Sequence, residues 1–140
     1  MKRGPRATDF VLDSFAFLAY LNDESGADTV ERLLASAAHG ASKGWMTVIN
    51  AGEVLYATER RRGTTAARAA IALLDLLGIR IVDANRQLTF AAAHIKAGHA
   101  LSYADAFATA LAQDLNAVLI IGDPEFRSVE SLVRVEWLER

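Results

Sequence analysis

Short apolar runs separated by amphipathic segments predict strands that alternate with helices along the chain. Runs at 10–12, 45–48, 79–82 and 117–121 are typical of parallel strands that are covered on both faces. The tail, 132–138, alternates apolar and charged residues, which predicts a strand at a sheet edge. Together they predict an α/β fold, a three-layer α/β/α sandwich with a mainly parallel, five-stranded sheet. Helices are predicted at 14–22, 26–39, 49–62, 64–78, 87–97 and 102–113.

Glycines and capping residues mark the predicted ends of several helices. Gly63 is expected to end the helix 49–62. Thr64 or Thr65 is then expected to cap the next helix. The helix 14–22 is so apolar that we expect it to be largely buried. Most of Phe15, Phe17 and Tyr20 are expected in the core, although some of them could instead contact a helix of a partner protein.

The segment from Leu101 to Phe126 predicts a helix, a buried strand and a tight turn with an acid near each end. Ser102 is expected to cap the helix, which places Asp105 in its first turn. The strand ends at Gly122, and Asp123 follows directly. The carboxyl ends of parallel strands and the starts of the helices share one edge of a sheet, where ligands bind. We therefore expect the two acids to lie on one rim.

Two further acids occupy equivalent positions. Asp13 follows the first strand, and Glu53 lies near the start of the helix that follows the second. Asn50 lies three residues before Glu53, so the two side chains share a helix face, and the amide could hold a water or a phosphate oxygen. Singly, each of the four acids has an ordinary explanation as a cap, a turn residue or a first-turn acid. Ser14 could help to orient a metal-bound water, but capping is the favoured role for it.

The four acids together point to a cation. A pair of carboxylates 4 Å apart repels by roughly 4 kcal/mol at an effective dielectric constant of 20. We therefore expect raised pKa values in the metal-free protein and a divalent cation that offsets the repulsion. A site of carboxylate oxygens suits Mg²⁺ or Mn²⁺ rather than zinc, and the histidines show no metal-binding spacing.

The composition says more about the class of protein and its location than about its chemistry. The length of 140 residues predicts a single domain over 1–140, and the 52% hydrophobic content argues against disorder. Without cysteine there are no disulfides and no thiolate zinc site, and no apolar run is long enough to span a membrane, so we expect a cytoplasmic protein. The net charge of −2 neither indicates nor excludes a nucleic-acid partner. Arg60, Arg61 and Arg62 are compatible with RNA phosphate contacts or with a solvated helix end.

The motifs VLDS, TVINAGEVLY, LSYADAFATALA and AVLIIGDPEF, in this order, resemble the PIN domain, and specifically the VapC-type toxins of toxin–antitoxin systems. The resemblance covers nearly the whole chain. It implies a Mg²⁺- or Mn²⁺-dependent endoribonuclease that hydrolyses RNA, a homodimer, and a cognate antitoxin whose tail covers the active site. The metal-binding and catalytic acids that it implies are Asp13, Glu53, Asp105 and Asp123, with Ser14 and Asn50 as supporting residues.

Other functions stay open on the sequence. A PIN-fold nuclease of routine RNA processing would carry the same motifs, and a non-catalytic interaction module could keep the acids as caps. A phosphotransfer domain is disfavoured, because Asp13-Ser14-Phe15 lacks the second acid of a phosphatase nucleophile motif and no lysine follows the late strand.

Overall fold

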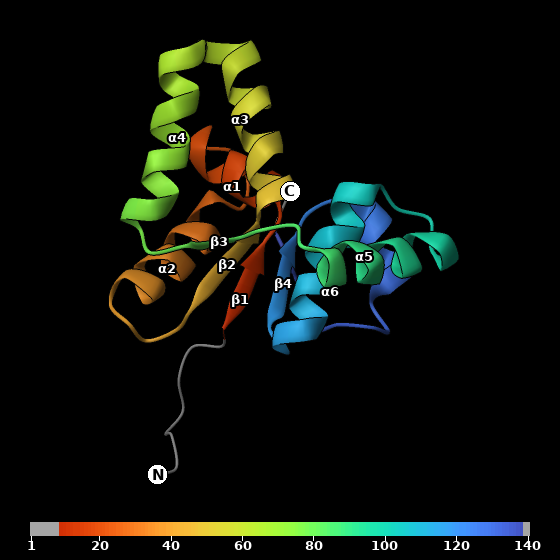
Figure 1. Cartoon of the computed structure of the whole chain (residues 1–140). Helices are drawn as coiled ribbons and strands as arrows, with labels where there is room; N and C mark the ends of the chain where they lie inside the picture. The colour runs from red at the N-terminus through yellow and green to blue at the C-terminus, as the bar shows by residue number, and fades with distance from the viewer. Residues whose placement is uncertain (1–8, 139–140) are drawn as a thin grey trace.

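The computed structural model describes residues 9–138 and contains a five-stranded, all-parallel sheet in the order β3-β2-β1-β4-β5 (Figure 1). The predicted parallel α/β architecture is therefore confirmed, including the edge position of the last strand. The strands are β1 (Phe10–Leu12), β2 (Gly44–Thr47), β3 (Arg80–Val82), β4 (Val118–Ile121) and β5 (Val135–Trp137).

The helices cover both faces of this sheet, with α1 to α4 on one side and α5 and α6 on the other (Figure 1). A 3₁₀ helix, η1 (Pro124–Val129), follows β4. The helices are α1 (Ser14–Leu21), α2 (Ala27–Ala38), α3 (Val48–Arg62), α4 (Thr64–Leu76), α5 (Arg86–Gly98) and α6 (Tyr103–Leu115). None of the helices in this part of the chain is long and apolar enough to cross a membrane.

Two hydrophobic cores result from the alternation of side chains along the central strands. In β1, Phe10 and Leu12 pack among α1 to α4, whereas Val11 packs against α5 and α6. In β4, Ile120 joins the first core, whereas Leu119 and Ile121 join the second. Each central strand thus buries both of its faces, which explains its continuous apolar sequence.

Two local expectations are corrected. The cap of α4 is Gly63, with φ of 92° and no side-chain hydrogen bond, rather than Thr64 or Thr65. The chain passes from α3 into α4 through this single left-handed residue, so both threonines already lie within the helix. In α1, Phe17 is buried as expected, but the side chain of Phe15 is 46% exposed. This helix has eight residues, and only one of its faces packs against the sheet.

Two glycines provide a test of the packing. A methyl group on Gly44 would overlap the ring of Phe10 and the side chain of Ile79, both buried in the first core. Gly52 lies in α3 with nothing near its added methyl group. We expect Gly44→Ala to lower the free energy of unfolding by about 1–3 kcal/mol, through overpacking. Gly52→Ala should raise it by about 0.5–1 kcal/mol, because alanine favours a helix.

Urea unfolding of both variants beside the unmodified protein measures the two effects. A Gly44→Ala variant as stable as the unmodified protein would contradict the close packing of β2 against β1.

Candidate active site

The acids gather at the edge of the sheet where the parallel strands end. Asp13 follows β1 directly, and Asp123 follows β4 after Gly122. These two strands are neighbours in the sheet (Figure 1). Asp105 comes from the first turn of α6 and Glu53 from the second turn of α3. Electrostatic interactions join Asp13 to each of the other three, so the sheet brings together the four acids predicted from the sequence.

Backbone hydrogen bonds fix the direction of two of these acids. Asp13 is 1% exposed, and its Oδ1 accepts from the backbone N–H of Ala16 at 2.8 Å, so it caps α1. Asp123 caps η1 in the same way, accepting from the N–H of Glu125 at 2.9 Å. The same two side chains therefore cap a helix and belong to the acid cluster. Their role as caps does not exclude a role in binding a metal ion.

A fifth acid, Glu125, belongs to the cluster and was missed in the sequence. One carboxyl oxygen from each of Asp105, Asp123 and Glu125 lies within 4.8 Å of the others. The short 3₁₀ turn after Asp123 brings residues two apart to the same rim. The spacing Asp-Pro-Glu was the available signal, but an exposed acid after proline is common at the start of such a turn.

A hydrogen-bond network holds Glu53 in place. Its Oε1 accepts from Ser14 Oγ at 2.7 Å and from Asn50 Nδ2 at 3.3 Å. The amide of Asn50 is fully buried and also donates to the carbonyl of Ala104, next to Asp105, at 3.3 Å. The network thus ties α1, α3 and the start of α6 together.

The amide oxygen of Asn50 accepts from Thr47 Oγ1 at 2.6 Å, and the Asn50 backbone N–H donates back to the same hydroxyl at 3.0 Å. All of these contacts are within the protein. These hydrogen bonds hold Asn50 in place and position Glu53 and the start of α6.

Burial and mutual repulsion perturb the two central acids. Burial raises the pKa of Asp13 well above its ordinary value, and the charges of Asp105, Glu53 and Asp123 raise it further, against the Ala16 hydrogen bond. Burial, with the charges of Asp123, Glu53 and Glu125, raises the pKa of Asp105 to about 7. No basic side chain of the described residues is among the causes of either shift.

The donor set fits a divalent cation of the Mg²⁺ or Mn²⁺ type. All five members are carboxylates, three of them within reach of one ion, and neither cysteine nor histidine takes part. A cation at this position would offset the repulsion that the pKa shifts report.

Comparison with known proteins identifies the family. The sequence model of the PIN domain matches residues 10–132, most of the chain. The chain belongs to the PIN-domain family. A search of curated proteins gives no match to this PIN domain.

Solved structures share the fold of this PIN domain. A chain of VapBC2 from Rickettsia felis, bound to a DNA fragment from the promoter, aligns with a TM-score of 0.73 at 16% identity, over 93% of this chain and 98% of that chain. VapC20 of Mycobacterium tuberculosis, a sarcin-ricin loop cleaving toxin, aligns with a TM-score of 0.70 at 22% identity, over 86% and 95%. A toxin-antitoxin complex from Klebsiella pneumoniae gives 0.68 at 14% identity, over 91% and 96%. The resemblance drawn from the sequence motifs is confirmed for the PIN family and for the fold.

The arginines of α3 lie away from the acids of the PIN domain. Arg60 is seven residues beyond Glu53, or about 10 Å along the helix axis, and Arg61 and Arg62 end the helix. Arg60 packs over the ring of Tyr56, at 5.0 Å from its centroid. They occupy the tip of the hairpin formed by α3 and α4, which projects from the sheet (Figure 1).

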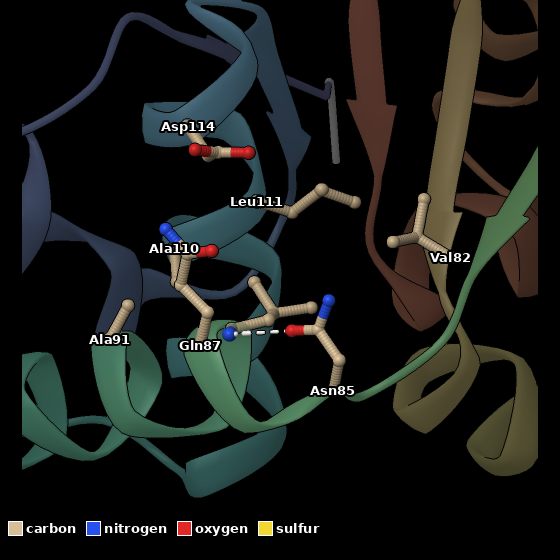
Figure 2. Close-up of a pocket in the computed structure, with 8 residues that line it drawn as sticks. Val82, Asn85, Gln87, Ala91, Ala110, Leu111 and Asp114 are labelled. Carbon is tan, nitrogen blue, oxygen red and sulfur yellow. Dashed lines mark hydrogen bonds between the residues drawn. The ribbon is translucent and has the colours of Figure 1, made fainter.

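A separate cavity of about 120 Å³ lies between the end of β3 and the helices α5 and α6 (Figure 2). Its lining is partly apolar, with Leu88, Ala110 and Leu111, and includes Asp114 near the end of α6. It contains none of the five clustered acids.

The raised pKa of Asp105 predicts how the stability of the metal-free PIN domain depends on pH. The unfolded chain loses this proton near pH 4, whereas the folded protein keeps it until about pH 7. This acid therefore lowers the free energy of unfolding as pH rises from about 4 to about 7, and Asp13, whose pKa is also raised, acts in the same direction. Asp105→Asn, which cannot ionise, should flatten the decline and be as stable as the unmodified protein, or more so, at pH 7.5.

Thermal unfolding in a chelating buffer between pH 4.5 and 8 measures this dependence. Asp28→Asn, which removes an exposed acid of α2, should keep the decline and serves as the control. A melting temperature that rises steadily from pH 5 to 7 would contradict the repulsive cluster.

Proposed function

We propose that this PIN domain is a Mg²⁺- or Mn²⁺-dependent endoribonuclease, the toxin of a type II toxin–antitoxin pair. The observation that carries the proposal is the group of buried and half-buried carboxyl groups at the sheet edge, whose repulsion no basic side chain within residues 9–138 offsets. PIN-family membership and the shared fold with a toxin that cleaves RNA support the choice of reaction.

In this proposal the acids hold the cation, and Ser14 and Asn50 position one of them. Asp13 and Asp105 are the central ligands, and Asp123 completes the site together with Glu125, which lies beside it. Glu53 faces the same rim, where its hydrogen bonds to Ser14 and Asn50 fix its position. When bound, the cation would lower the pKa of a water molecule and offset the charge that develops on the phosphate during hydrolysis.

The charge of the acid cluster also affects how an RNA approaches the site. Without the cation, the charge of the cluster repels a phosphate, so binding of the cation and of RNA should be mutually favourable. The arginines at 60–62 are proposed to contact the RNA backbone away from the scissile bond, since they lie well beyond the cluster.

Partners and location belong to the same proposal. Solved relatives of similar fold are toxin–antitoxin assemblies from several bacteria, which supports a cognate antitoxin for this chain. We also propose that the protein forms a homodimer and is located in the cytoplasm.

The proposal is tested by Asp13→Asn. Asparagine caps a helix about as well as aspartate, so the fold should persist while one ligand is weakened. In the unmodified protein, millimolar Mn²⁺ should raise the melting temperature by about 2–5 °C, corresponding to a concentration roughly ten times the dissociation constant. Asp13→Asn should lose this rise and should cleave RNA at least 100-fold more slowly, because even outer-shell changes cost about 10–100-fold in a metal site.

Asp9→Asn is the matched control. Asp9 precedes β1, at the opposite end of the strands from the acid cluster. There its carboxylate accepts from the N–H of Lys43 at 2.9 Å. This variant should keep both the metal response and the cleavage. If the unmodified protein shows neither, the acids are structural and the chain is an interaction module with a PIN fold.

A further inference from the structure

An exposed aromatic ring lies directly beside the acid cluster. Phe15 follows Asp13 and Ser14 at the start of α1, and its side chain is 46% exposed although the helix around it is apolar. The ring also covers the backbone of Gly122, the residue before Asp123. Phe15 therefore lies between the chain segments that carry two of the clustered acids.

The backbone beneath the ring fixes its position. A methyl group on Gly122 would overlap the ring atoms Cδ1 and Cε1 of Phe15, so only glycine lets the ring lie this close to the end of β4. Gly122 is itself buried. The ring thus packs against main chain at Gly122 while much of the side chain stays exposed, which places a flat, apolar surface at a polar site.

We propose that Phe15 is the platform on which an unpaired RNA base next to the scissile phosphate stacks. The proposal rests on the ribonuclease function proposed above and adds how the substrate is positioned. A phosphate held at the acids carries its nucleoside with it. Phe15 and Tyr103 are exposed aromatic residues that each lie two positions from a clustered acid, and Phe15 also lies against Gly122, which precedes a second one. Single-stranded RNA is commonly bound by stacking its bases on aromatic side chains.

An RNA base fits this surface better than a helix of a partner protein does. The exposed ring is flanked by Asp13 and Asp123, and carboxylates that repel one another give a poor apolar groove for a protein side chain. A base stacks through its face and leaves its polar edges in water, so it suits a single ring with polar surroundings. Stacking is also tolerant of base identity, so Phe15 should position the RNA rather than select its sequence.

The test compares Phe15→Leu, which keeps the apolar volume but removes the flat ring, with Phe15→Trp, which keeps an aromatic face. On a single-stranded RNA with one mapped cleavage site, Phe15→Leu should raise KM by about 5- to 150-fold, the range measured for loss of one stacked base. The kcat and the rise in melting temperature with Mn²⁺ should stay as in the unmodified protein, because the acids are untouched. Phe15→Trp should restore KM.

Two controls make the result specific. Phe90→Leu removes another exposed ring, 61% exposed on α5 and outside the acid cluster, and should leave KM unchanged. An RNA that lacks the base on one side of the cleaved bond should bind more weakly to the unmodified protein, with no further loss for Phe15→Leu.

The possible outcomes separate this inference from the proposed function. Cleavage by Phe15→Leu with an unchanged KM would overturn the platform and leave the ribonuclease standing. An unchanged KM of Phe15→Leu together with weaker binding of a cognate antitoxin would assign the ring to a protein partner. That outcome would also overturn the platform. If the unmodified protein cleaves no RNA, and the indole of Phe15→Trp shows no fluorescence quenching by single-stranded RNA with Ca²⁺ present, both proposals fail.

Discussion

The mutual repulsion of carboxyl groups at one edge of the sheet is the constraint on which the site depends. Asp13 is almost completely buried and lies within electrostatic range of three other acids, and Asp105 is half-buried and lies within range of four. Such an arrangement opposes folding in the absence of a cation. It persists because each carboxyl group is positioned by the fold around it, through a strand end, a helix start or a hydrogen bond.

The polar network around Asn50 shows how this positioning works. One buried amide connects Glu53 with the first turn of α6, and Thr47 holds that amide in place from the end of β2. The stabilising energy lies elsewhere, in the two apolar cores on either face of the sheet. The protein thus separates stability, supplied by the layers of the sandwich, from the chemistry of the sheet edge, where the mutually repelling carboxyl groups gather.

The sequence predicted the frame of this site but not all of its members. Buried parallel strands have continuous apolar runs, so their ends, and therefore the positions of Asp13 and Asp123, could be located before the structure was known. Glu125 was not located in this way, because its place in the cluster depends on the tight turn of η1 rather than on any periodic pattern. The exposure of Phe15 escaped prediction for a similar reason. The apolar composition of α1 indicates burial of the helix, but which residue faces the sheet edge depends on how the helix packs.

The most direct measurement of the central claim is the position of a bound ion. A crystal of the protein grown with millimolar Mn²⁺ would show the ion by its anomalous scattering. We expect a peak at the sheet edge, about 2 Å from carboxylate oxygens of the central ligands Asp13 and Asp105. A fully occupied Mn²⁺ elsewhere on the protein, with no peak at these acids, would contradict it.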